Sequence, residues 1–125
     1  MGGATLDAGP LIGLERLDRE VENWVAAALE EEVDLRVPAP VIAEVWRGGR
    51  RSAALARRLA MFEVVALDDA TARRAGELLA AVGGSATVDA MVVATAAQRG
   101  DAVLTSDTDD LAPLARAAGV PLAVL

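Results

Sequence analysis

The sequence lacks four residue types with distinctive chemistry: cysteine, histidine, tyrosine and lysine. Without cysteine there is no disulfide framework, no thiolate zinc site and no thiol nucleophile. Without histidine and lysine there is no Ser-His-Asp triad, no imidazole general base, no lysine Schiff base and no P-loop lysine. An enzyme of this composition must therefore draw its titratable chemistry from its 19 carboxylates and from what they bind.

Long hydrophobic runs and an excess of positive charge are also missing. No apolar stretch approaches the roughly 18–20 residues of a membrane helix, so we expect no membrane-spanning segment. The first 14 residues contain no basic segment of the kind that opens a secretory signal, and the absence of cysteine suits a cytoplasmic protein. The net charge of −7 argues against broad electrostatic binding to nucleic acid but leaves room for a local basic patch.

The composition is that of a globular chain, with 54% hydrophobic and 25% charged residues, and 125 residues suit a single domain over 1–125. Short apolar runs alternate with helical patterns, which predicts an α/β fold with a mostly parallel sheet covered on both faces. The expected strands are residues 4–6, 35–37, 63–67, 102–105 and 121–125. The expected helices are residues 10–14, 19–32, 41–47, 53–61 (with Ser52 as its cap), 68 or 69 to 82, 87 or 89 to 99, and 111–118.

Four acidic residues lie at strand ends or within apolar helical segments, rather than on the polar surface where most carboxylates are found. Asp7 follows the first strand and Asp107 follows the fourth, so both are expected at the same edge of a parallel sheet. Glu44 lies within the apolar helical segment VIAEVW, and Asp89 opens the apolar helix TVDAMVVATAA. Unpaired carboxylates are costly to bury, and a divalent cation such as Mg²⁺ or Mn²⁺ would offset that cost.

Each of these acids also has a purely structural interpretation. Asp89 is compatible with a helix cap, Asp107 with a turn or a cap, and Asp7 with an Asx turn. Neither a helix cap nor a turn explains Glu44, although it is compatible with a solvent-facing position. Because the α/β layout brings all four toward one region, we favour a joint site.

The segments LDAGPLI, PAPVIAEVWRG, VDAMVVATA and LTSDTDDL, in this order from Leu6 to Leu111, resemble the PIN domain. In particular they are similar to the VapC-like ribonuclease toxins of prokaryotic toxin–antitoxin pairs. The resemblance implies a three-layer α/β/α sandwich with a mostly parallel central sheet. The sequence departs from the family pattern at Gly9-Pro10, where small or apolar residues are usual.

The resemblance also implies an Mg²⁺- or Mn²⁺-dependent endoribonuclease in which one or two ions generate hydroxide and stabilise the charge on the phosphodiester. Asp7 and Asp89 would be the main metal ligands, and Glu44 and Asp107 would be second ligands or would orient the attacking water. A fifth acid is either Asp109 or Asp110, with Asp110 favoured. The hydroxyl neighbour of the last motif is Thr105 or Ser106. The catalytic and metal-binding candidates are therefore Asp7, Glu44, Asp89 and Asp107, with Asp110 as a further metal ligand.

Five arginines follow Glu44 closely: Arg47, Arg50, Arg51, Arg57 and Arg58. They are compatible with a solvated helix face, with docking of an acidic partner segment, or with a patch for the RNA backbone. On the last interpretation Arg47, Arg50 and Arg51 are the candidate substrate-binding residues. For Trp24 and Trp46 we favour core packing over contact with a partner.

The family resemblance further implies a homodimer and a cognate antitoxin that wraps the toxin and blocks its site. Two other functions compete with the ribonuclease: a catalytically silent PIN-like binding module, and a metal-dependent phosphoesterase of another α/β family. The retained acidic set argues against the first of these. The lack of histidine and lysine weakens the second.

Overall fold

The computed structural model describes residues 2–125, so Met1 of the expected 1–125 domain lies outside the described residues. All five expected strands are present. They are β1 (Ala4–Leu6), β2 (Leu35–Pro38), β3 (Glu63–Val65), β4 (Ala102–Thr105) and β5 (Leu122–Val124). The helices are α1 (Ala8–Glu15), α2 (Arg19–Glu30), α3 (Ala39–Val45), α4 (Ala53–Leu59), α5 (Asp69–Val82), α6 (Thr87–Arg99) and α7 (Leu111–Ala118), with a short 3-10 helix η1 (Gly49–Ser52).

The strands form one sheet in the order β3-β2-β1-β4-β5, and every neighbouring pair is parallel. The central strand β1 aligns Thr5 with Arg36 of β2 on one side and with Val103 of β4 on the other. The chain builds outward from β1 to β3 and then returns to add β4 and β5 on the opposite side. The strand order therefore reverses between β1 and β4, and ligands of such sheets bind beyond the carboxyl ends of the strands at this point.

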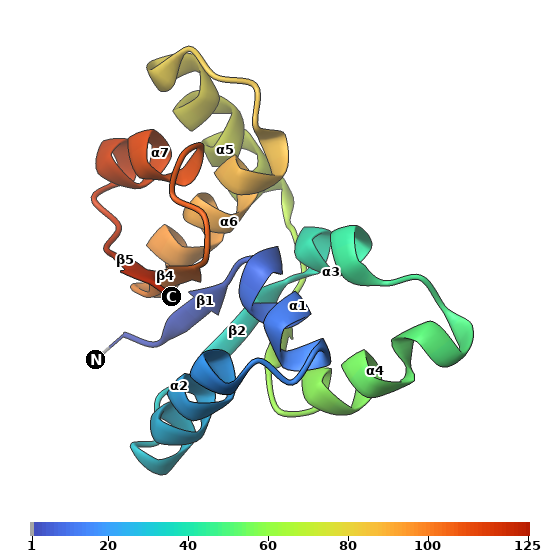
Figure 1. The fold of residues 1–125 in the computed structure, drawn as a ribbon. Helices are drawn as coiled ribbons and strands as arrows, with labels where there is room; N and C mark the ends of the chain where they lie inside the picture. Colours follow the sequence, from blue (N-terminus) through green and yellow to red (C-terminus); the bar gives the residue numbers. More distant parts are fainter. Residues whose placement is uncertain (1) are drawn as a thin grey trace.

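Helices cover both faces of the sheet, as expected for a three-layer α/β/α fold. Helix α6 packs against β1, β2 and β4, and α1 packs against β4. Figure 1 shows α5, α6 and α7 together toward one side of the sheet, and α1, α2 and α4 toward the other. In the described part of the chain no single helix is long and apolar enough to span a membrane, and only the pair α5 and α6, bent by 116°, passes that test together.

Two helices begin two residues earlier than expected from the positions of Pro10 and Pro40. Helix α1 starts directly after Asp7, and α3 starts at Ala39, so Pro10 and Pro40 lie inside the first turns. Proline is tolerated there because the amide hydrogens of a first turn have no partner within the helix. Helix α2 ends at Glu30 rather than residue 32, because Glu32 takes a left-handed φ of 58°.

Two sequence interpretations are corrected. Ser52 occupies the expected N-cap position of α4, but its side chain makes no capping hydrogen bond. It is buried instead, and its Oγ accepts hydrogen bonds from the backbone N–H groups of Arg47 (2.9 Å) and Gly48 (3.0 Å). The preference for core packing is wrong for Trp46, which is 42% exposed, whereas Trp24 packs against the core. Both corrections concern the segment after α3, whose shape depends on left-handed Gly48 and Gly49.

A buried ion pair ties together the opposite, amino-terminal edge of the sheet. Asp101, just before β4, is fully buried and accepts hydrogen bonds from Gly3 N (2.8 Å), Thr5 Oγ1 (2.8 Å) and Arg36 Nη1 (2.7 Å). Partial burial lowers the pKa of Arg36, but the bonds and charges of Asp101 and Glu63 outweigh it and raise that pKa above its ordinary value. Every polar atom of this carboxylate is thus used in holding β1, β2 and β4 together.

We expect Asp101→Ala to lower the free energy of unfolding by about 3–5 kcal/mol, because it leaves a partly buried arginine and two hydrogen-bond donors without their carboxylate. Urea denaturation measures this change. The matched control is Asp69→Ala, which breaks an exposed pair with Arg73 within one helix and should change stability by about 0.5 kcal/mol or less. Equal stability losses in the two variants would contradict the structural role of Asp101.

Candidate functional site

The topology brings the predicted acids to the carboxyl edge of the sheet, at the reversal between β1 and β4. Asp7 directly follows β1, and Asp107 follows β4 by two residues. Asp110 immediately precedes α7. Asp89 lies in the first turn of α6, which leads into β4 and so begins at this same edge. Glu44 comes from the last turn of α3.

Asp89 is the electrostatic centre of this group. Partial burial is the largest cause that raises its pKa from 3.8 to about 6, followed by the negative charges of four other acids. These are, in decreasing order of effect, Asp7, Asp110, Glu44 and Asp107. The other four acids named from the sequence therefore all lie close enough to act on Asp89, and we call the five together the acidic cluster.

Asp89 is not the cap of its helix. Helix α6 starts at Thr87, and the cap position is Ala86, which has no side chain able to accept a hydrogen bond. Among the hydrogen bonds of residues 2–125, none involves the Asp89 carboxylate. The capping interpretation therefore fails at this residue, although a carboxylate in the first turn is still favoured by the helix dipole.

Thr105 connects the two strand-end acids. Its buried hydroxyl lies 3.1 Å from Asp7 Oδ2 and 2.9 Å from the carbonyl oxygen of Asp107, so its single proton is shared between two acceptors. The same oxygen accepts a hydrogen bond from Asp107 N (3.0 Å). Sequence reasoning left Thr105 and Ser106 open, and the structure places Thr105 in contact with Asp7, with Ser106 exposed.

Gly9 permits the close approach of α1 to the turn after β4. A Cβ at this position would lie 3.0 Å from Ser106 Oγ and 3.1 Å from its Cβ, which is tighter than ordinary packing. The departure from the usual family pattern at Gly9 thus has a local packing reason.

Asp107, Asp110 and Glu44 are the exposed members of the acidic cluster. Asp107 Oδ1 accepts a hydrogen bond from Asp109 N (3.0 Å), so the predicted turn role is real for one of its two oxygens. Glu44 is solvent-accessible, yet partial burial of its carboxyl and then the charge of Asp7 raise its pKa above the usual value. Asp107 therefore contributes one oxygen to the turn and Glu44 is open to solvent, and the charges of both still act on Asp89.

No arginine neutralises the acidic cluster. Within residues 2–125 none of the salt bridges includes one of its five acids, in contrast to the fully paired Asp101. Oxygen donors of this kind suit Mg²⁺ or Mn²⁺. In the described part of the chain no three acidic side chains converge tightly enough to enclose an ion as they stand.

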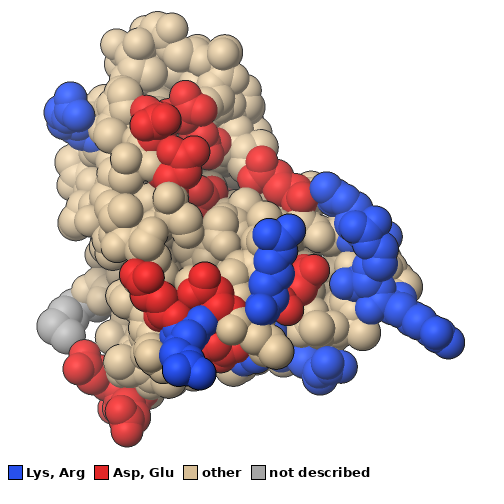
Figure 2. Space-filling model, viewed as in Figure 1, with Lys and Arg blue, Asp and Glu red and all other residues tan. Residues whose placement is uncertain are grey.

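Arginines occupy the other end of the same molecular face. Figure 2 shows acidic side chains gathered over the end that carries α7, and arginines over the end that carries α3 and α4. Arg47, Arg50 and Arg51 are exposed on the segment that Ser52 holds in shape. Arg58 differs from them, because it pairs with Glu22 of α2 through both guanidinium nitrogens. The basic patch, meaning the exposed arginines that follow Glu44, therefore has fewer members than the five arginines named from the sequence, because Arg58 is paired.

A recess of about 190 Å³ joins the basic patch to the acidic cluster. Glu44 lines it together with Arg16, Arg47 and Arg51. Sequence reasoning missed Arg16, because it lies 28 residues before Glu44 at the end of α1 and no motif includes it. Only the packing of α1 against α3 brings it to this position.

Comparisons with solved structures find the same fold in toxin–antitoxin complexes. A chain of VapBC2 from Rickettsia felis, bound to a promoter DNA fragment, matches with a TM-score of 0.79 at 14% identity, over 98% of both chains. A toxin–antitoxin complex from Klebsiella pneumoniae matches with a TM-score of 0.72 at 24% identity, over 88% of this chain and 91% of that one. DNA-bound VapBC from Salmonella typhimurium matches with a TM-score of 0.72 at 20% identity, over 99% and 98%.

No curated protein matches the sequence. The family model described as "PIN domain" matches residues 4–119, which include every strand but β5, every helix and the whole acidic cluster. The fold, the strand-end position of the acids and the family match agree with one another. The chain belongs to the PIN-domain family.

Proposed function

We propose that this protein is an Mg²⁺- or Mn²⁺-dependent endoribonuclease and the toxin of a VapBC-type toxin–antitoxin pair. The observation that carries the proposal is the acidic cluster: five acids lie at the topological switch point and have no arginine partner within residues 2–125. Partial burial and the charges of the other four raise the pKa of Asp89 to about 6. Such a group is unfavourable unless a cation binds there, and PIN domains generally are nucleases. The fold likeness to chains of VapBC complexes supports the toxin part of the proposal.

In this proposal Asp7 and Asp89 are the main metal ligands, and Glu44, Asp107 and Asp110 complete the set. A divalent cation held there would supply hydroxide near neutral pH and offset the charge of the phosphodiester. Thr105 holds Asp7 in place, because its hydroxyl contacts the Asp7 carboxylate within the buried end of β4. Glu44 and Asp107 keep free oxygens toward solvent and so can orient water.

The exposed arginines would hold the RNA backbone. Arg16, Arg47 and Arg51 line the same recess as Glu44, and the exposed Arg50 directly precedes Arg51 in the chain. Positive charge close to the acidic cluster offsets its repulsion of phosphates while leaving the metal ligands free. We also propose a homodimer, a cytoplasmic site of action, and a cognate antitoxin that covers the site.

The test is cleavage of single-stranded RNA by the purified protein with Mg²⁺ or Mn²⁺, with and without EDTA. The proposal expects internal cleavage that requires the metal and stops with EDTA. Hydrolysis of small phosphate esters without RNA cleavage would indicate another phosphoesterase instead. RNA binding without cleavage in any divalent metal would indicate a silent binding module.

We expect Arg50→Ala combined with Arg51→Ala to weaken RNA binding and to flatten its salt dependence. For single-stranded RNA, removing one arginine–phosphate interaction reduces the slope of log K against log salt by about 0.7. Fluorescence anisotropy in EDTA at several salt concentrations measures this slope. The control replaces Arg73 and Arg74, which pair with acids of their own helix α5. A slope unchanged from wild type in the Arg50/Arg51 variant would remove these residues from the RNA path.

A further inference from the structure

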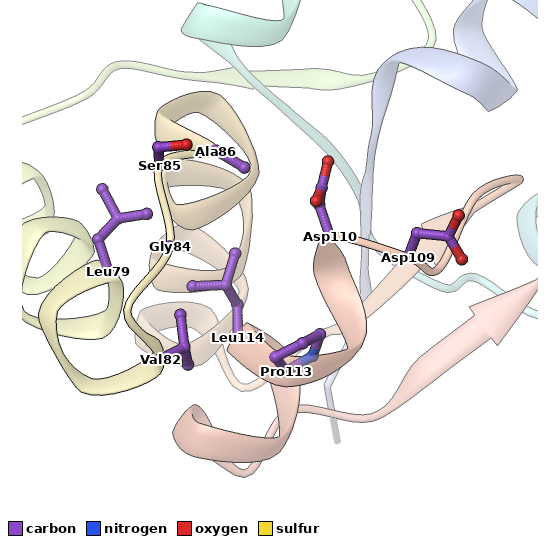
Figure 3. Close-up of a pocket in the computed structure, with 9 residues that line it drawn as sticks. All are labelled: Leu79, Val82, Gly84, Ser85, Ala86, Asp109, Asp110, Pro113 and Leu114. Carbon is purple, nitrogen blue, oxygen red and sulfur yellow. The ribbon is translucent and has the colours of Figure 1, made fainter.

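A second hollow adjoins the acidic cluster on the side opposite the arginines. It has a volume of about 360 Å³ and lies between the end of α5, the loop that leads into α6, and the first turn of α7. Figure 3 shows Leu79, Val82 and Leu114 grouped on one side, Ser85 and Asp110 toward the other end of the lining, and the Asp109 carboxylate directed away from the other lining residues. Asp109, Ala86, Gly84 and Pro113 complete its lining. We call this hollow the α5–α7 cavity.

The α5–α7 cavity is continuous with the acidic cluster through Asp110. Asp110 lines the cavity, and its charge is one of those that raise the pKa of Asp89. A group that enters the cavity therefore lies next to the atoms that would hold the metal. The volume falls within the range of small-molecule sites, at its lower end.

From this geometry we propose that the α5–α7 cavity receives one nucleobase of the RNA, from a nucleotide next to the cleaved phosphodiester. The inference rests on the proposed ribonuclease function. Asp109 and Asp110 at the rim repel phosphate, so the occupant is an uncharged part of the substrate. The walls of Leu79, Val82, Pro113 and Leu114 offer apolar surface to the faces of a base that has left its stack.

The polar groups of the rim also predict which bases fit best. Carboxylates accept hydrogen bonds, and so they favour bases with an exocyclic amino group, namely adenine, cytosine and guanine. Uracil has no amino group, and its one ring donor on this edge, N3–H, lies between two carbonyl oxygens that the carboxylates repel. The Ser85 hydroxyl can either donate or accept and so adds a contact for any base.

Gly84 gives direct access to the interior of the cavity. A Cβ at this position would point to the apolar wall, 3.2 Å from Val82 Cγ2 and 3.9 Å from Leu79 Cδ2. The backbone of Gly84 has none of the positive φ values found at Gly48, Gly49, Gly83, Gly100 and Gly119, so a side chain there strains no backbone angle and requires only a small shift of the Val82 side chain. Gly84→Leu should therefore fill the cavity without changing the acidic cluster.

The experiment combines this variant with RNAs that differ at single nucleotides on either side of the cleaved bond. Each position carries adenine, cytosine, guanine, uracil or no base at all. For wild type with Mn²⁺ we expect removal of the base at one of these positions to lower kcat/KM about tenfold, and uracil there to lower it severalfold. In Gly84→Leu both effects should disappear, because the leucine keeps the base out of the cavity and its removal then costs no contact.

Ala81→Leu is the matched control, because it adds the same side chain to an exposed position of α5 that does not line the cavity. It should keep the wild-type dependence on the base. Ser85→Ala provides a second test that does not depend on packing: it should reduce discrimination among the bases and leave cleavage of the abasic RNA unchanged. Thermal melting and size-exclusion chromatography accompany each variant.

The outcomes separate this proposal from the proposed function. If wild type cleaves RNA but the losses from Gly84→Leu and from base removal multiply, no base occupies the cavity and the ribonuclease function stands. If Gly84→Leu changes the oligomeric state and leaves base dependence intact, the cavity is a contact between copies and the proposal is overturned. If wild type cleaves no RNA with any divalent metal, the proposed function itself fails.

Discussion

Asp7→Asn should lower the rate of RNA cleavage by on the order of a hundredfold or more, the loss expected when one preorganised electrostatic stabiliser is removed. Asparagine keeps the size of the side chain and its contact with Thr105 but removes the charge that would bind the cation. Cleavage depends on that cation both for hydroxide and for charge stabilisation, so the chemical step loses most of its support. Single-turnover cleavage at saturating RNA measures the effect directly.

Asp69→Asn is the control for the loss of one negative charge. The Asp69 side chain is 80% exposed, and its charge is not among those that raise the pKa of Asp89. It should cleave at the wild-type rate. RNA affinity in EDTA should change little in Asp7→Asn, or rise, because a charge that repels phosphate is gone. Cleavage by purified Asp7→Asn at the wild-type rate would refute the assigned mechanism and point to a contaminating nuclease.

The strand ends were the most predictable part of the molecule. Asp7 and Asp107 each follow a short apolar run, and parallel strands place such positions at one edge wherever helices connect them. The α/β alternation and all five strands are confirmed for the same reason. Helix ends were less predictable, since Pro10 and Pro40 fit equally well before a helix and inside its first turn.

Contacts between distant segments were beyond the reach of local patterns. Asp101 follows Gly100 at the end of α6 and looks like one more turn acid, yet the register of β1 and β2 surrounds it with Thr5 and Arg36. Arg16 reaches Glu44 only through the packing of α1 on α3. The α5–α7 cavity likewise combines two segments some 30 residues apart.

The contrast between Asp101 and Asp89 separates an acid that holds the sheet together from an acid proposed to bind the metal. Asp101 is the more buried of the two, and it accepts three hydrogen bonds, one of them from the arginine with which it forms a salt bridge. Asp89 is only half-buried but is surrounded by like charges. Burial alone therefore does not mark the site; unpaired charge at the strand-order reversal does.

The same unpaired charge predicts how the stability of the metal-free protein depends on pH. The pKa of Asp89 is about 6 in the folded chain against an ordinary value of 3.8, so the folded state binds the proton more tightly than the unfolded state. Protonation therefore favours folding, and this contribution is present in full below pH 3.8 and is lost as the pH rises through 6. A shift of this size corresponds to at most about 3 kcal/mol, and solvent screening of a half-buried group reduces it to about 1–2 kcal/mol.

In EDTA at pH 8 we therefore expect Asp89→Asn to be more stable than wild type by about 1–2 kcal/mol, and to lose that advantage at pH 4. Mn²⁺ should reverse the order at pH 8, because a ligand at 100 times its Kd stabilises the folded wild type by about 2.7 kcal/mol and the variant has lost a main ligand. Urea denaturation at both pH values, with and without Mn²⁺, measures all four differences. An advantage of the same size at pH 4 and pH 8 would mean that asparagine packs better there, with no charge repulsion to relieve. Equal stabilisation of both proteins by Mn²⁺ would place the metal away from Asp89.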